Sequence, residues 1–222
     1  ILGYSQLMKD DFLEDSEEHE NLVVMERQSQ ACRKIVADLL KFSRQSGSSP
    51  GKVKVNEILT DVLAITEHNL HLDHIEIERC FADDLPVIDG DEEKLRQVFV
   101  NLINNGQHAM EDEGGVLTVR TSYSSEDNMV TASVIDTGTG IDQEIITRVF
   151  DPFFTTKSVG KGTGLGLSVS YGIIEDHKGS ISIESPVADR TGKGLHPGTA
   201  MHIKLPVPEA DNPESDALHT DN

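Results

Sequence analysis

The sequence predicts an α+β protein of two layers, in which a mixed sheet carries helices on one face and follows an α-helical hairpin. Candidate strands and helices follow one another after residue 52 without the regular alternation that a parallel-sheet protein shows. Before that point, apolar or small residues recur at steps of three and four, the spacing of a narrow helical stripe. The chain has 222 residues, enough for one sizeable core with a helical extension.

The hairpin is predicted over residues 1–46. Residues 1–12 resemble the end of a helix, and in the acidic turn that follows Asp15 and Glu18 have the spacing of a helix cap. The second helix carries its stripe on Leu22, Met25, Ser29, Cys32, Val36 and Leu39. A stripe this narrow predicts a partner, either the first helix with a second copy of the chain or the rest of the same domain.

The remaining chain divides into a linker over 47–52, a domain over 53–207 and an acidic tail over 208–222 with little to bury. Asn56 and Asp91 are predicted to cap the first two helices of the domain. The predicted strands are 52–55, 75–81, 116–123, 129–136, 180–185 and 199–205. The predicted helices are 56–70, 91–110 and 165–177, with a loop at DDLPVIDGD and an irregular, glycine-rich region over 137–163.

Composition excludes several classes of protein. The formal net charge is −20, so the surface repels nucleic acid and anionic lipid, and neither is an expected partner. Cys32 and Cys80 have no paired spacing for zinc or a disulfide framework, and we expect both to be small buried residues in a reducing compartment. No signal peptide or membrane-spanning run is present, so a cytoplasmic location is expected; any membrane anchor would lie elsewhere in a longer protein.

A glycine-rich segment, GKGTGLGLS, begins at Gly160 and precedes an apolar helix, as phosphate-binding loops do. The P-loop is excluded because Lys161 is followed by Gly162 where Ser or Thr is required. The dinucleotide fingerprint is excluded because its last glycine would fall on Leu165 or Leu167. Alone, the segment is equally compatible with a flexible surface loop.

Three further blocks precede this segment: NLINNGQHAM (101–110), DTGTGI (136–141) and RVFDPFFTTK (148–157). In this order the four blocks resemble the N, G1, F and G2 boxes of sensor histidine kinases, whose ATP-binding fold is shared with gyrase, Hsp90 and MutL. Gly198 and Thr199 resemble the last box of that fold. The resemblance covers about 53–207 and implies the Bergerat fold, a two-layer α/β sandwich.

The first block places Asn101, Asn105 and His108 at i, i+4 and i+7, on one face of a helix. Leu95, Val98, Phe99 and Leu102 are expected toward the core. An amide carbonyl suits Mg²⁺ that takes most of its ligands from phosphates. The resemblance makes Asn105 the metal ligand and places Asn101 and His108 near the phosphates. A hydrogen bond between helix and loop is the alternative role for Asn105.

The resemblance assigns Asp136 to the exocyclic amine of adenine, which would select ATP over GTP. Without the other blocks, Asp-x-Gly is an ordinary turn. Phe150, Phe153 and Phe154 are either lid residues or plain core aromatics. The complete implied ATP site comprises Asn101, Asn105, His108, Asp136, Gly138, Gly140, Ile141, Phe150, Lys157, Lys161, Gly162, Thr163, Gly164, Leu165, Gly166, Leu167 and Thr199.

Asn101 stands where hydrolases of this superfamily carry a glutamate that activates water, and an amide cannot take that proton. The site is therefore expected to hold Mg·ATP and to pass its γ-phosphoryl to a histidine, for relay to the receiver domain of a response regulator. The family pattern puts that histidine roughly nine residues before Ile1 on the same helix. His19 lacks the sequence context of an acceptor, so this chain is expected to bind ATP without autophosphorylating.

The hairpin is expected to form a homodimer in the full-length protein. Two alternatives stay open: a non-catalytic dimerisation or interaction module with a degenerate nucleotide fold, and a protein-serine kinase of the same superfamily that lacks a hairpin. The acidic tail is compatible with a following receiver domain. His68, His71 and His74 are three residues apart, which suits a solvated helix end better than a metal site, because such steps spiral around a helix.

Overall fold

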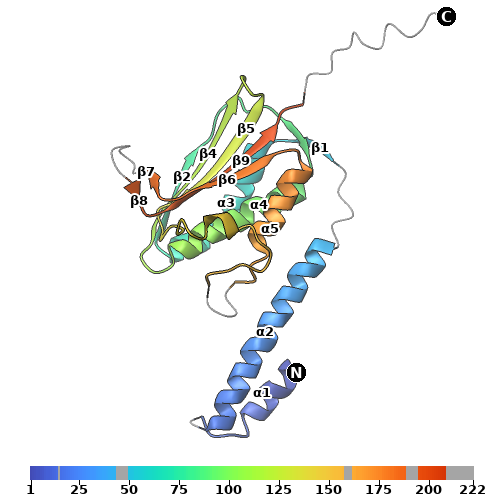
Figure 1. Cartoon of the computed structure of the whole chain (residues 1–222), viewed down its shortest axis with the longest axis vertical. Coiled ribbons are helices and arrows are strands. Elements are labelled where there is room, and N and C mark those ends of the chain that lie inside the picture. The colour runs from blue at the N-terminus through green and yellow to red at the C-terminus, as the bar shows by residue number, and fades with distance from the viewer. Residues whose placement is uncertain (15, 44–49, 158–161, 189–194, 209–222) are drawn as a thin grey trace, which may run out of the picture.

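The computed structural model of the chain describes residues 1–14, 16–43, 50–157, 162–188 and 195–208. Two helices form a hairpin that projects from a mixed sheet with helices on one face (Figure 1). The α+β class predicted from the sequence is confirmed, including the hairpin.

The hairpin consists of α1 (Leu2–Lys9) and α2 (Glu17–Ser43). The start of α2 is capped by Ser16, whose Oγ accepts the His19 N–H at 3.2 Å; Asp15, the predicted cap, lies outside the described residues. Because α1 is much shorter than α2, it covers only part of the predicted stripe. Leu22 is buried, whereas Met25, Cys32 and Val36 are exposed.

The main sheet has five strands in the order β2-β4-β5-β9-β6. The first pair, β2 (Ile75–Cys80) and β4 (Gly115–Ser124), is parallel, and all other neighbours are antiparallel. The remaining strands of this sheet are β5 (Met129–Asp136), β6 (Ser180–Glu184) and β9 (Thr199–Pro206). Two small antiparallel pairs flank it: β1 (Gly51–Val53) with β3 (Ile88–Gly90), and β7 (Val187–Ala188) with β8 (Leu195–His196).

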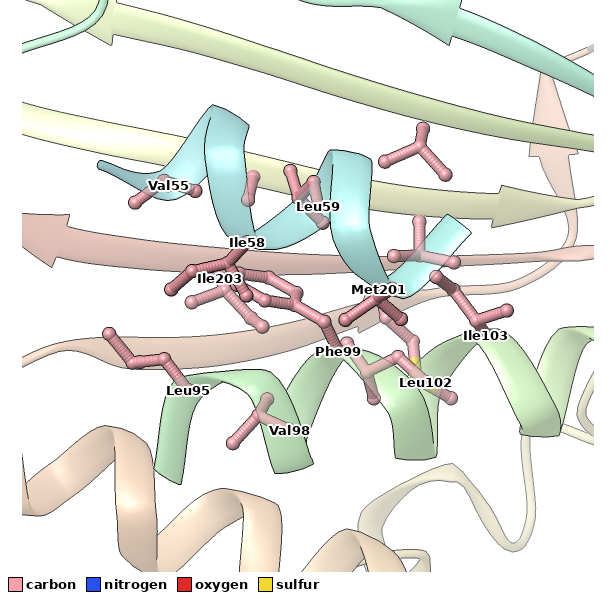
Figure 2. Packing of buried hydrophobic residues seen from close by; sticks show 14 of the residues in the cluster. Val55, Ile58, Leu59, Leu95, Val98, Phe99, Leu102, Ile103, Met201 and Ile203 are labelled. Carbon is pink, nitrogen blue, oxygen red and sulfur yellow. The ribbon is translucent and has the colours of Figure 1, made fainter. Parts of the chain in front are cut away.

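Three helices cover one face of the sheet: α3 (Val55–Leu72), α4 (Glu92–Ala109) and α5 (Gly166–Asp176). A 3-10 turn, η1 (Ile146–Arg148), lies in the predicted irregular region. The core forms between the helices and the sheet, where Phe99 of α4 meets α3 and the side chains of β9 (Figure 2). The four α4 residues expected toward the core are all buried there, as the helical period requires: Leu95, Val98, Phe99 and Leu102.

Three sequence predictions are wrong. Asn56 does not cap α3, which begins after Lys54; its amide instead donates to the Ala82 carbonyl and accepts from the Thr121 hydroxyl, both at 2.9 Å. The loop DDLPVIDGD contains β3, which pairs with β1. Cys32 and Cys80 are exposed. Cys80 ends β2 at the edge of the sheet, and Cys32 lies on a part of α2 that α1 does not cover.

The predicted cap at Asp91 is confirmed, since its side chain accepts the Lys94 N–H at 3.1 Å. A second contact fixes the same helix end. His177 Nε2 accepts the Asp91 N–H at 2.9 Å, and His177 Nδ1 lies 2.6 Å from the Ile173 carbonyl oxygen. The first turn of α4 is thus joined to the last turn of α5.

Candidate nucleotide-binding site

Asn101 joins α4 to the start of α5. Its Nδ2 donates to Ser170 Oγ at 2.9 Å, and Ser170 is buried. Its Oδ1 faces Gly166, where a Cβ atom would collide with that oxygen. The glycine at the first position of α5 therefore leaves room for the Asn101 side chain, which joins the two helices.

One turn further along α4, Asn105 contacts the last residue of the RVFDPFFTTK block. Lys157 Nζ donates to Asn105 Oδ1 at 3.2 Å, and both side chains are half-buried. His108 lies one turn beyond, with an exposed side chain whose Nδ1 is 2.7 Å from the Asn104 carbonyl oxygen. Asn101, Asn105 and Lys157 thus gather at one side of α4.

Asp136 ends β5, and its side chain is buried next to Gly106 of α4. Its Oδ1 accepts the N–H groups of Gly138 at 3.0 Å and Thr199 at 3.2 Å. Burial raises the pKa of Asp136 to about 6, although the two N–H donors act in the opposite direction. Thr199 is itself buried and lies directly opposite Asp136 in the β5–β9 register.

The turn after Asp136 runs against the end of α4. A Cβ atom at Gly138 would collide with the Ala109 carbonyl oxygen, and the Thr139 N–H donates to that oxygen at 3.1 Å. Gly140 has φ +75°, a conformation that glycine adopts without strain. The close approach of the backbone to α4 therefore depends on Gly138, whereas Gly140 packs against Ser185 and Gly198.

Ser185 holds the end of this turn and was not singled out by the sequence. It is buried, its Oγ accepts the Ile141 N–H at 2.8 Å, and its hydroxyl donates to the Gly198 carbonyl at 2.7 Å. Its backbone carbonyl accepts a hydrogen bond from the Gln143 amide. Neither Ser185 nor Ser170 lies within one of the four sequence blocks. The sequence alone therefore gives no reason to assign them to the site.

The aromatic block lies beside α5. The rings of Phe150 and Tyr171 are 5.5 Å apart, and the Arg148 guanidinium lies 4.7 Å from the centre of the Phe154 ring. Phe153 is exposed, with φ +68°, and its N–H donates to the Gly164 carbonyl at 2.9 Å. The block is thus joined by backbone to the glycine-rich segment.

The described part of the glycine-rich segment leads directly into α5. Gly164 has φ +66°, the Leu165 N–H lies 3.4 Å from Thr163 Oγ1, and Leu165 is buried. Gly166 and Leu167 form the first turn of α5 and are half-buried. Lys161, another predicted phosphate contact, lies outside the described residues.

A family model described as histidine kinase-, DNA gyrase B-, and HSP90-like ATPase matches residues 90–209, a little over half of the chain. The chain belongs to this ATPase family. The matched region contains α4, the buried Asp136, the RVFDPFFTTK block and the start of α5. The resemblance to sensor histidine kinases is confirmed.

Curated relatives of this ATPase-family chain are histidine kinases. It is 34% identical to sporulation kinase A of Bacillus subtilis (strain 168), over 93% of this chain and 32% of that protein. It is also 34% identical to sporulation kinase C of the same organism, over 93% of this chain and 45% of that protein. The chain therefore spans less than half the length of these relatives.

Solved structures agree on the fold of this ATPase-family chain. The nucleotide-free catalytic domain of histidine kinase ThkA matches with a TM-score of 0.60 at 28% identity, covering 72% of this chain and 99% of that one. Full-length ShkA in complex with AMPPNP matches with a TM-score of 0.67 at 24% identity, covering 95% of this chain and 43% of that one. The second match includes the hairpin and bears on the fold alone.

The donor set suits a divalent cation only when a nucleotide supplies further oxygens. Within the described ranges, His, Cys, Asp and Glu form no group of three or more that could hold a metal ion. Asn105 Oδ1 offers one hard oxygen, and a cation, the Lys157 ammonium, already contacts it. This matches Mg²⁺, which is commonly bound through few protein oxygens together with phosphates and water.

Among the described helices, none is long and apolar enough to cross a bilayer.

Proposed function

We propose that this chain is the ATP-binding catalytic region of a sensor histidine kinase. Membership of the ATPase family and the similarity to named histidine kinases support this proposal. The observation that carries it is the pairing of a buried acceptor, Asp136, with an uncharged amide, Asn101, at the position where a hydrolase needs a base.

Asp136 would select adenine. Its Oδ1 already accepts two backbone N–H groups, and its second carboxylate oxygen would accept the exocyclic amine of the base. Guanine presents a carbonyl oxygen at that position, which would leave the buried carboxylate without a donor. The glycine turn at 138–140 would let the backbone approach the ring.

The phosphates would lie between α4 and the glycine-rich segment. Asn105 Oδ1 would hold Mg²⁺, which neutralises phosphate charge when bound. Lys157 supplies a positive charge, and N–H groups at the start of α5 face anions favourably because of the helix dipole. The predicted contacts of His108, Lys161, Thr163, Phe150 and Ile141 stay part of this proposal.

The γ-phosphoryl would pass to a histidine and then to a receiver domain. The Asn101 amide cannot accept a proton, and its Nδ2 is engaged by Ser170, so the site lacks a base to activate water at this position. ThkA has been solved in complex with the response regulator TrrA, a partner of the class that we propose for this chain. We propose, from the pattern of the family, that the acceptor histidine lies N-terminal to Ile1.

A titration with a fluorescent ATP analogue and Mg²⁺ tests the first half of the proposal. We expect saturable binding that ATP displaces much better than GTP, and Asp136→Asn should abolish this preference. Absence of binding would favour the non-catalytic interaction module. Incubation with γ-labelled ATP tests the second half, because acid-labile label on this chain would show that it carries its own acceptor.

A further inference from the structure

The contact between Lys157 and Asn105 occupies the atom that the proposed function assigns to the metal ion. Lys157 Nζ lies 3.2 Å from Asn105 Oδ1. The lysine therefore places one positive charge on the only atom of Asn105 that can bind a cation.

The surrounding chain holds the lysine in this direction. The backbone N–H of Lys157 donates to Thr155 Oγ1 at 3.2 Å, and this hydrogen bond closes a local turn at the start of the lysine side chain. The lysine stem lies against Gly162, where an added Cβ atom would be 3.1 Å from Lys157 Cβ and 3.2 Å from Lys157 Cδ. A side chain at 162 would press on this stem, so the glycine leaves room for the lysine to cross to α4.

A divalent cation and an ammonium group would repel each other at this oxygen, although its two lone pairs could in principle meet both. Mg²⁺ binds an oxygen ligand at about 2.0–2.1 Å and requires near-octahedral geometry around it. An ammonium nitrogen 3.2 Å from the same oxygen would lie no more than about 5 Å from the metal ion, close enough for the like charges to repel each other strongly in a partly buried site.

We propose that Lys157 and the divalent cation are alternative occupants of Asn105, so that the lysine serves as an internal cation until Mg·nucleotide displaces it. This inference rests on the proposed function. It makes the lysine and the metal negatively coupled: the lysine supports nucleotide binding most when no divalent cation is present, and least when one is bound.

Nucleotide affinity measured with and without metal tests this coupling. ADP would be titrated into the wild-type chain and Lys157→Met, in excess Mg²⁺ and in EDTA. The loss of affinity caused by Lys157→Met should be larger in EDTA than in Mg²⁺ by about tenfold or more. Lys204→Met is the matched control, because Lys204 lies exposed on β9 at the uncovered face of the sheet and pairs with Asp127.

Equal losses of affinity in the two conditions, or a larger loss in Mg²⁺, would overturn the proposal, because lysine and metal would then act independently or together.

A second readout needs no nucleotide. The side-chain amide resonances of Asn105 should shift in Lys157→Met and stay in place in Lys204→Met, and unchanged resonances in both variants would also count against it. If the wild-type chain binds no nucleotide in Mg²⁺, the proposed function fails, whereas the amide resonances still report on the lysine contact.

Discussion

The carboxylate of Asp136 is buried at the end of β5 and accepts two backbone N–H groups, one from Gly138 in the following turn and one from the distant Thr199. Burial raises its pKa from the ordinary range of an aspartate to about 6, so the folded protein disfavours the ionised form. The group therefore stabilises the fold below about pH 4, where it is protonated in both states, and loses this contribution as the pH rises through about 6.

The ionised form of Asp136 is the better acceptor for an amine, so nucleotide affinity should depend on the pH. With a pKa of about 6, roughly a tenth of the carboxylate is ionised at pH 5, and we expect affinity for Mg·ATP to fall about tenfold between pH 7 and pH 5. Asp136→Asn is the control for titration of the nucleotide itself. A wild-type pH profile that matches that of the variant would contradict this role of the carboxylate.

Two glycines of α5 allow a matched test of the Asn101 contact. Gly166→Ala would drive a methyl group into Asn101 Oδ1, and we expect a loss of about 1–3 kcal/mol in the free energy of unfolding. In Gly172→Ala the added Cβ atom meets nothing within 4 Å, and the helix should gain about 0.5–1 kcal/mol. Urea denaturation measures both, and equal effects would show that the Asn101 side chain moves aside freely.

Among the elements, α4 is the one that positions the site, and both of its ends are fixed by other segments. Asp91 and His177 satisfy N–H groups of the first turn and its cap, and the Ala109 carbonyl at the last turn accepts the Thr139 N–H. A Cβ atom at Gly90 would lie 2.7 Å from the His177 ring, so the ring packs closely against the backbone next to its hydrogen bond with the Asp91 N–H.

His177→Ala should therefore destabilise the domain. Removal of the ring takes away the acceptor of the N–H group of the buried Asp91, which we expect to lower the free energy of unfolding by about 1–3 kcal/mol. His68→Ala, on the exposed side of α3, is the control and should change it by less than about 0.5 kcal/mol. Comparable unfolding midpoints for the two variants would argue against a structural role for His177.

Elements with a long, regular pattern were predictable from the sequence, and short ones were not. The 18-residue helix α4 and its Asp91 cap follow from apolar spacing, whereas β3 has three residues and exists through pairing with β1. The residue type of Asn56 favours a helix cap, but its contacts with Ala82 and Thr121 decide its position. In the candidate site, the four sequence blocks predict Asn105 and Asp136. The contacts of Ser170 and Ser185 depend on the folded structure, so the sequence does not predict them.

Over the whole molecule, negative charge is in large excess, with 39 acidic against 19 basic residues. The ion pairs of the described residues lie mostly at the surface, where each contributes little. Apolar side chains are also exposed on the hairpin, including Leu7, Leu13, Met25 and Val36. This exposure supports the proposed homodimer through the hairpin in the full-length protein.

Self-repulsion of the acidic surface should make stability depend on salt. Raising NaCl from about 0.01 M to about 1 M shortens the Debye length from about 30 Å to about 3 Å, and we expect the melting temperature to rise by several degrees. Scanning calorimetry over this range, repeated in KCl, measures the effect. A melting temperature that falls with salt would mean that attractive ion pairs outweigh the net repulsion.

The strand order has a consequence for synthesis on the ribosome. The last strand along the chain, β9, lies between β5 and β6, and the Asp136–Thr199 pair joins residues 63 positions apart. A nascent chain that lacks β9 would expose the backbone edges of both neighbours and lack the Thr199 donor to Asp136. We therefore expect the domain to fold only after residue 206 has left the exit tunnel, and a chain ending near residue 188 to stay sensitive to proteases.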